Sequence, residues 1–329
     1  MDTMYIMDTI AQNGNFGIFP IVFGAVDSEN DESWEWFFKQ LSNVIPDDRG
    51  LAIISDRHIA IGNIIGKVYP LATRRICTYH LYKNILQRFR GGESFRLIKK
   101  EANAYRIYDF NAIFEEIHQV NHALHAHLQK ADVRCWTRVY FDKDKYNFTT
   151  TNIAESINKV LSEARSLPIM QLIDAIRSIL TRWFAEWRND AGLMKTVSTC
   201  GIEKLLAGHV ERCKDLTVQE IDAHQFEVGG GAYVNVVNLI AQKYTCRMFE
   251  LDKIPCIHDI AAAEAKRASP IWLCYKYYHT NYLSNAYAAS ISQGIDNHLF
   301  RIGRSKDMRT FLIMPTSRKA KEVQFKSAM

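Results

Sequence analysis

Two small groups of cysteine and histidine residues have the types and spacing of metal ligands. In the first group, a single cysteine, Cys246, is followed by the Cys-x-His pair of Cys256 and His258. Thiolates and imidazoles suit Zn²⁺, and a structural zinc site uses four ligands. The nearby Tyr244 is a poor fourth ligand because a phenol ionises only at about pH 10. Two further candidates lie later in the chain, Cys274 and His279.

The second group is the pair of Cys77 and His80, separated by two residues where a strand is expected to give way to a helix. Two ligands do not close a zinc site. A half-buried cysteine beside an ordinary histidine therefore remains the simpler interpretation of this pair.

Two acidic residues occupy positions that suit catalysis as well as helix capping. Asp56 follows the apolar run 51–55, and the carboxyl end of such a strand is where an open α/β sheet presents functional groups. Carboxylates gathered there can hold two Mg²⁺ ions for phosphoryl transfer. Asp56 can equally cap the next helix, and Glu155 can close a capping box on Asn152. Both alternatives stay open.

The elements that must position these residues alternate between strands and helices. Asn13-Gly14 between two β-prone runs predicts a hairpin. Asn30 or Asp31 can cap the helix that follows, and the continuously apolar run 51–55 predicts a strand covered on both faces. The expected elements are strands 4–11 and 16–26, helix 31–44, strand 51–55, helix 59–69, a short strand around 75–77 and helix 81–89. This order predicts a mixed sheet with helices on it.

The rest of the chain is mostly helical before it turns to short strands. A helical region is expected over 94–132, and a second helix opens at 151–155. Pro168, with Ser166 as its candidate cap, begins the longest periodic stretch. After the glycines at 229–231, alternation predicts antiparallel strands, and an alanine-rich helix closes the region. Their expected ranges are 233–239, 243–249 and 260–268.

Composition excludes several classes of protein. The chain has 329 residues, of which 47% are hydrophobic and 23% charged, so it has apolar material for about two domains. This composition is not that of a disordered protein or of a small disulfide-stabilised scaffold. No run reaches the roughly 18 consecutive apolar residues of a membrane helix. We expect a soluble intracellular protein. The net charge of +5 resides in the residues after 300, which carry +6, and therefore argues only weakly for nucleic acid.

Several segments, taken together and in order, resemble the Mutator-like element (MULE) transposases of plants and their SWIM-type zinc finger. The resemblance covers most of the chain. It rests on residues 18–37, on Ile54-Ser55-Asp56-Arg57, on Cys77-x-x-His80-x-x-x-Asn84, on residues 151–156, on Cys246-Arg247-x-Phe249, on Ile254-Pro255-Cys256-x-His258 and on Tyr282-Leu283-Ser284.

The resemblance implies a fold, a chemistry and a partner. The fold would be an α/β ribonuclease-H-like transposase core with a helical insertion, followed by a small hairpin-plus-helix SWIM module. Asp56 would be the second acid of a DDE triad and Glu155 the third, with Mg²⁺ or Mn²⁺ as cofactor. Zinc would be held by Cys246, Cys256 and His258, while Cys77 and His80 match the family's Cys-x-x-His. The ancestral activity would be DNA transposition at terminal inverted repeats, in the nucleus. No membrane association is expected, and homo-oligomerisation is left open.

Two departures from the family pattern limit this expectation. The first catalytic Asp lies on a strand upstream of the hairpin in the family, and Asp2, Asp8 and Asp27 do not match its motif. We therefore expect a chain truncated within its first sheet, without its first strand, and catalytically inactive. Tyr244 also stands where SWIM modules carry their first cysteine, which predicts weakened zinc binding.

These observations lead to one preferred reading and one alternative. The preferred reading is a MULE transposase-derived protein with a degenerate SWIM zinc site, and the alternative is a domesticated DNA-binding regulator resembling the far-red-response factors. The expected organisation is a partial core over 1–92, a helical insertion over 93–150, a helical return of the core over 151–225, a SWIM finger over 226–270 and a basic C-terminal segment over 271–329.

Overall fold

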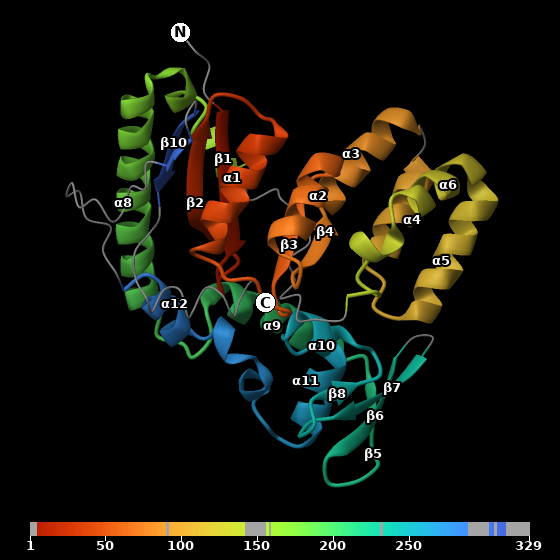
Figure 1. The fold of residues 1–329 in the computed structure, drawn as a ribbon. Helices are drawn as coiled ribbons and strands as arrows, with labels where there is room; N and C mark the ends of the chain where they lie inside the picture. Colours follow the sequence, from red (N-terminus) through yellow and green to blue (C-terminus); the bar gives the residue numbers. More distant parts are fainter. Residues whose placement is uncertain are drawn as a thin grey trace. The chain divides into compact units, whose positions relative to one another are not determined.

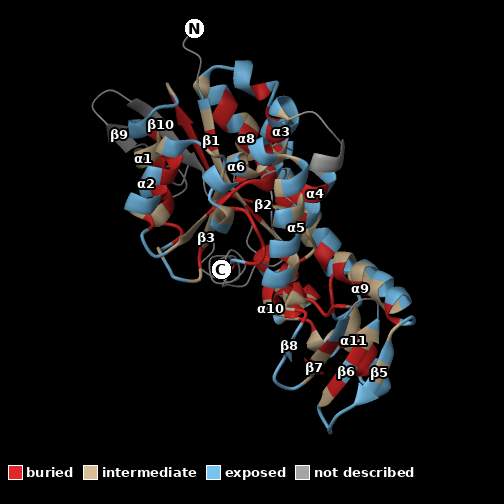
Figure 2. Ribbon diagram, turned by 90° about the vertical axis from the view of Figure 1, so that its right-hand side faces the viewer, coloured by how far each residue is buried: buried red, intermediate tan, exposed pale blue. Residues whose placement is uncertain are grey.

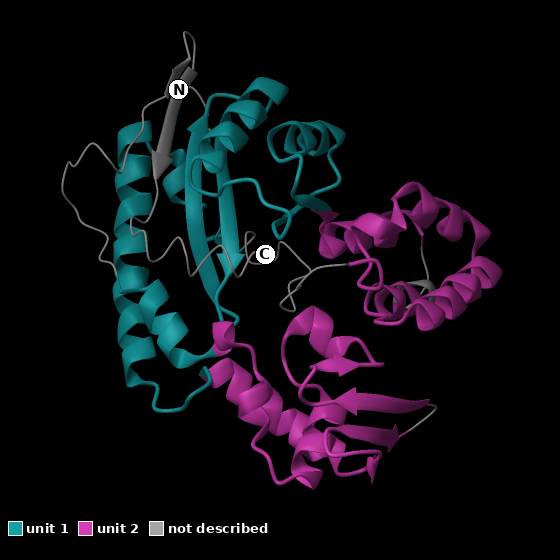
Figure 3. Cartoon of the chain, turned by 60° about the horizontal axis from the view of Figure 1, so that its bottom comes forward, with its two compact units in different colours: residues 1–74, 151–199, 279–329 teal, residues 75–150, 200–278 magenta. Residues whose placement is uncertain are grey.

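The computed structural model describes residues 5–89, 92–141, 156–157, 159–230, 233–288, 303–305 and 308–313. Within them the chain forms two compact units, each assembled from separate stretches of sequence (Figure 3). Unit 1 comprises residues 1–74, 151–199 and 279–329, and unit 2 comprises residues 75–150 and 200–278. Both units mix helices with small sheets, so the expected α/β class is confirmed at this level (Figure 1).

Unit 1 is built on the predicted hairpin. Strand β1 (Tyr5–Gln12) pairs antiparallel with β2 (Ile18–Val26). The side chain of Asn13 sets the turn, because its Oδ1 accepts hydrogen bonds from the backbone N–H groups of Asn15 and Gly17 at 2.9 and 2.8 Å. Strands β9 (Gly303–Ser305) and β10 (Met308–Ile313) extend this sheet in the order β1-β2-β10-β9. The sequence had indicated only a basic tail for this C-terminal region.

Helices cover the hairpin. In α1 (Asp31–Ser42), Asn30 is the cap, since its Oδ1 accepts the backbone N–H of Ser33 at 2.8 Å. Phe37 of α1 joins Val22 and Val26 of β2 in one buried cluster, whereas Phe23 packs with residues of α8 (Ile169–Leu193). β2 is buried along almost its whole length (Figure 2). α8 is the predicted long helix, but Pro168 itself is its cap, and Ser166 belongs to the preceding 3₁₀ turn, Ala164–Ser166.

The strand before Asp56 differs from its expected burial. β3 (Ala52–Ser55) forms only a two-stranded sheet with β4 (Thr73–Ile76), and its residues are partly exposed. The prediction of a central strand covered on both faces was therefore wrong in the described residues. The apolar run is explained by a single packed side, where Ile53 lies against the main core of unit 1. α2 (Ile59–Val68) follows, and α12 (Thr280–Ala286) completes the described helices of unit 1.

Unit 2 combines a group of helices with a four-stranded sheet. Its helices before the sheet enclose a single apolar cluster that includes Leu81, Ile117 and Trp136. Their bounds are α3 (Thr78–Arg88), α4 (Gly92–Ala102), α5 (Ile107–Val120) and α6 (His122–Lys130). α9 (Cys200–Cys213) precedes the sheet in the chain and falls within the region 151–225 that was expected to be helical.

The sheet of unit 2 is an antiparallel meander in the order β5-β6-β7-β8. Its strands are β5 (Thr217–Glu220), β6 (Gln225–Gly230), β7 (Tyr233–Asn238) and β8 (Lys243–Tyr244). The predicted partner strand 243–249 is therefore only two residues long, because α10 (Met248–Asp252) begins at Met248. α11 (Ile257–Ala265) lies against β5, β6 and β7 (Figure 1).

Candidate metal centre

The three ligand atoms of Cys246, Cys256 and His258 lie within 4.8 Å of one another. The two Sγ atoms are 3.6 Å apart, and Nδ1 of His258 is 3.3 Å from Sγ of Cys256. Both cysteines are buried, and His258 is partly exposed. It is the one group of three or more Cys, His, Asp or Glu side chains with this geometry among the residues that the structure describes.

Backbone turns at both ends of α10 bring the two cysteines together. Arg247 and Lys253 flank α10 in the left-handed conformation, with φ of 59° and 56°. Residues other than glycine adopt this conformation uncommonly, so the chain reverses sharply at both points. Cys256 then caps α11, and its N–H donates to the buried carboxylate of Asp259 at 2.8 Å, as in a capping box.

The electrostatics of the sulfur pair favour metal binding. The hydrogen bond between the two sulfurs lowers the pKa of Cys246 to about 5, even though burial opposes this shift. Burial raises the pKa of Cys256, so the two cysteines shift in opposite directions. The thiolate is the form that ligates metals. Two sulfurs and an imidazole nitrogen are a donor set that fits Zn²⁺.

A residue of β7 holds the far side of the histidine ring. Nδ2 of Asn235 lies 3.0 Å from Nε2 of His258. Oδ1 of Asn235 accepts a hydrogen bond from Arg106, which stands at the start of α5. Binding of a metal through Nδ1 leaves the hydrogen on Nε2, so the amide of Asn235 would then turn its oxygen toward this N–H, and such a partner fixes ring orientation in metal sites. Asn235 and Arg106 carried no signal in the sequence, because one is an unremarkable position in a strand and the other lies 129 residues away.

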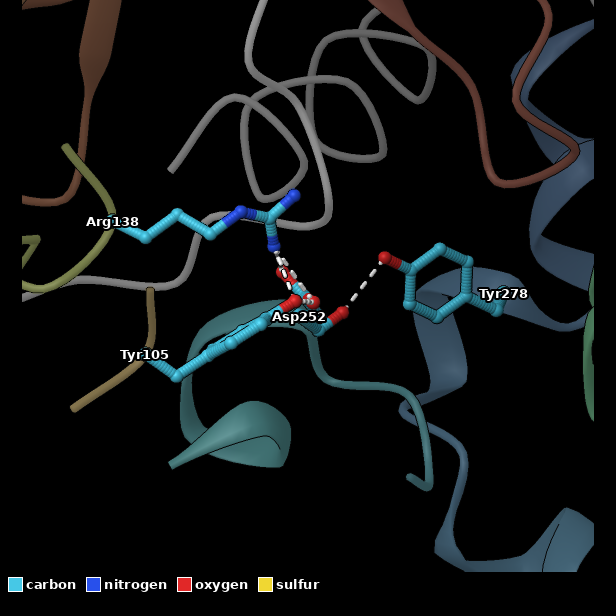
Figure 4. A network of polar contacts seen from close by, with 4 residues as sticks. All are labelled: Tyr105, Arg138, Asp252 and Tyr278. Carbon is cyan, nitrogen blue, oxygen red and sulfur yellow. Dashed lines mark hydrogen bonds and ion pairs between the residues drawn. The ribbon is translucent and has the colours of Figure 1, made fainter. Parts of the chain in front are cut away.

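A buried ion pair anchors the end of α10 (Figure 4). Nη1 of Arg138 donates to both carboxylate oxygens of Asp252, at 2.9 and 3.0 Å. Tyr105 donates to the same carboxylate, and the hydroxyl of Tyr278 donates to the backbone oxygen of Asp252 at 2.9 Å. The contacts join the helices of unit 2 to the segment that carries the centre. The sequence did not indicate this network, because Tyr105 and Arg138 lie 147 and 114 residues before Asp252 in the chain.

The other predicted site residues lie apart from this centre. Asp56 is exposed, and its Oδ1 accepts the N–H of His58 at 3.0 Å just before α2 begins. Glu155 lies outside the described residues. Cys77 is buried as the cap of α3, and the partly exposed His80 follows in that helix. Neither residue belongs to a three-ligand group within the described ranges.

Cys274, a candidate fourth ligand, is buried outside the cluster. Its pKa is raised to about 12, first by burial and then by the charge of Glu203. Among the residues described, no fourth Cys, His, Asp or Glu side chain joins the three ligand atoms of the centre.

The cluster of two sulfurs and an imidazole, carried by the turn after β8 and by the start of α11, defines a zinc-finger class of site. Comparison with protein families assigns two segments of the chain. Residues 2–84 match the MULE transposase domain, and residues 245–267 match the SWIM zinc finger. The chain therefore contains one segment similar to a MULE transposase domain and one similar to a SWIM zinc finger. A search of curated proteins finds no match. In the part that the structure describes, no helix has the length and apolarity needed to cross a membrane.

Proposed function

We propose that this transposase-derived protein retains zinc binding at Cys246, Cys256 and His258 as its working biochemistry. The observation that carries the proposal is the convergence of three donor atoms within 4.8 Å in the segment that matches the SWIM zinc finger. When bound, zinc would cross-link the turn after β8 to the start of α11 and so stabilise this part of unit 2.

We further propose that the chain descends from a ribonuclease-H-like DDE transposase and no longer performs strand transfer. The order of hairpin, helix, strand and helix in the MULE match supports the ancestry. The surroundings of Asp56 support the loss of activity, because its side chain is exposed and accepts the N–H of His58 in a local turn. Among the residues described, it belongs to no group of three acids. Two-metal transfer needs several carboxylates around the ions.

The proposed partner is DNA, at sequences of the terminal-repeat type, and the proposed location is the nucleus. The MULE match supports DNA as the partner. A second candidate function is that of a domesticated DNA-binding regulator. The local use of the Asp56 carboxylate favours this candidate over an active enzyme, since a regulator binds DNA without catalysis.

The test of the zinc proposal is metal analysis of the purified chain. We expect zinc to bind to the wild-type protein and to be lost in Cys256→Ser. Cys213→Ser is the matched control, because Cys213 is a buried cysteine of α9 outside the cluster and its thiol donates to the backbone oxygen of Val210. Equal zinc contents in the two variants would contradict the proposal.

The test of inactivity is a cleavage and strand-transfer assay on terminal-repeat DNA with Mg²⁺ or Mn²⁺. We expect binding without cleavage. Metal-dependent cleavage that Asp56→Ala abolishes would overturn the proposal and restore Asp56 as a catalytic acid. Binding of DNA without cleavage in both proteins would leave the regulator as the better description.

A further inference from the structure

Three buried oxygen atoms beside the metal centre have no hydrogen-bond partner. They are the hydroxyl of Tyr244, Oδ1 of Asp259 and Oε2 of Glu250. Tyr244 is 3% exposed, and Asp259 is fully buried. Buried polar atoms in folded proteins almost always have a partner, and an ion or water at the site is a common reason for an orphan. The grouping of three orphans at one place therefore calls for a common partner.

Hydrogen bonds tie these residues to the centre. Asp259 accepts the N–H of the ligand Cys256 through Oδ2, which leaves Oδ1 free. Oε1 of Glu250 accepts the N–H of Tyr244 at 2.9 Å, which leaves Oε2 free. Tyr244 ends β8 two residues before the ligand Cys246, and its buried ring packs against Phe249 of α10.

The coordination of zinc leaves room for such a partner. Zinc prefers four ligands in a tetrahedron, and three protein ligands leave one position open. No fourth side chain of the usual ligand types joins the cluster in the described ranges. A water molecule in the open position would give one lone pair to zinc and keep two protons to donate.

Hydrogen-bond accounting favours water over direct ligation by the tyrosine. A zinc-bound water can donate to Oδ1 of Asp259 and to the hydroxyl oxygen of Tyr244, and that hydroxyl can in turn donate to Oε2 of Glu250. All three orphans then have partners. Direct ligation by the oxygen of Tyr244 would leave both carboxylate oxygens unpartnered, each at the cost of burying an unsatisfied acceptor.

We propose that the zinc centre of this chain is an open site with two cysteines and one histidine, whose fourth ligand is a water molecule held by Tyr244 and Asp259. This inference rests on the proposed zinc binding and adds the identity of the fourth ligand. An open position also makes the centre a binding site for small donors, thiolates and imidazole above all, because these ligands suit zinc better than water does.

The test replaces zinc with Co²⁺, whose absorption spectrum reports the number of thiolate ligands and the coordination. We expect wild type and Tyr244→Phe to show two thiolates and no tyrosinate charge-transfer band. Tyr244→Phe should weaken metal binding by roughly 10-fold to 100-fold, as the loss of an outer-shell partner does. Tyr244→Cys should add a third thiolate and tighten binding. Imidazole should change the cobalt spectrum of wild type and leave that of Tyr244→Cys unchanged.

Two results would overturn the open site. A tyrosinate band in wild type that disappears in Tyr244→Phe would make Tyr244 the ligand. Loss of one thiolate from the cobalt spectrum in Cys274→Ser would make the site a closed one with three cysteines. If Tyr244→Phe does not fold, Asp259→Asn provides the same affinity comparison. Failure of the proposed zinc binding would give a different result from failure of the open site. Wild type would then bind neither Zn²⁺ nor Co²⁺, and Cys256→Ser would behave like wild type.

Discussion

Nδ2 of Asn235 lies 3.0 Å from Nε2 of His258, while the other ring nitrogen, Nδ1, lies 3.3 Å from Sγ of Cys256. Arg106 in turn holds Asn235, so a helix terminus that is distant in sequence orients a metal ligand. The orientation of the His258 ring thus depends on the side chain of Asn235, which is only 2% exposed.

The first prediction concerns this contact. Asn235→Ala should lower zinc affinity by roughly 10-fold to 100-fold, because the ring of His258 loses its orienting partner while all three ligands remain. Competition with a zinc chelator measures the change. The control is Asn238→Ala on the same strand, since the side chain of Asn238 accepts the N–H of Ala241. Equal affinities of the two variants would show that Asn235 has no positioning role.

The second prediction concerns the buried ion pair. The side chains of Arg138 and Asp252 are only 7% and 12% exposed, so removing either partner leaves an uncompensated buried charge. Arg138→Met and Asp252→Asn should each lower the free energy of unfolding by about 3 kcal/mol. The double variant should lose much less than the sum.

Urea denaturation of the four proteins measures this coupling. The surface pair of Glu211 and Lys214 is the control, because its side chains are 72% and 60% exposed and its coupling should be below about 1 kcal/mol. Additive effects for Arg138 and Asp252 would mean that the pair contributes no interaction of its own.

The third prediction concerns a buried acid in α4. Glu101 is fully buried, and both of its carboxylate oxygens lack a partner. Burial raises its pKa to about 9 from an ordinary value of 4.5. Between these two pH values the folded chain keeps a proton that the unfolded chain releases. The contribution of Glu101 to stability is therefore fully present below pH 4.5 and is lost as the pH rises toward 9.

Glu101→Gln should remove this dependence. Unfolding by urea at several pH values across the range should show a flatter profile for the variant, with its largest gain over wild type in mildly alkaline solution. Glu227→Gln, at an exposed position of β6, is the control and should follow the wild-type profile. A wild-type slope retained in Glu101→Gln would exclude Glu101 as its source.

The fourth prediction concerns Asp56. Because its carboxylate accepts the N–H of His58, Asp56→Ala should cost about 1 kcal/mol of stability. Asp56→Asn keeps an oxygen acceptor and should stay within about 0.5 kcal/mol of wild type. Thermal or urea unfolding of the two variants separates these effects. If Asn and Ala behave alike, the turn does not depend on this side chain.

The sequence revealed features whose causes are local. The hairpin followed from Asn13-Gly14, and the side chain of Asn13 indeed closes the turn. The start of α1 followed from Asn30, which caps it. The metal centre could be predicted for the same reason, since Cys256 and His258 are close in the sequence and the turns at the two ends of α10 bring Cys246 to them.

What the sequence could not show depends on distant partners. β3 was expected to be covered on both faces because four apolar residues stand in a row there. Such a run does not reveal that β3 pairs only with β4 in a two-stranded sheet. β5 is short and largely polar, and the alternation of β6 runs only from Gln225 to Val228, too short a stretch to indicate a strand by itself. The contacts of Arg106 and Arg138 join residues 129 and 114 positions apart, and no local pattern predicts such pairs.

The sequence separation of 114 residues between Arg138 and Asp252 also sets the order in which the two partners are synthesised. Unit 2 takes helices α3 to α6 from residues 75–150 and its zinc segment from residues 200–278. At roughly 5–20 residues per second, Arg138 emerges from the ribosome about 6 to 23 seconds before Asp252. During that interval the helices carry the guanidinium of Arg138 without Asp252, the partner that it has in the finished protein. Completion of unit 2 thus awaits the last third of the nascent chain, and a translation product that stops before Asp252 would expose an unmatched charge to the quality-control machinery.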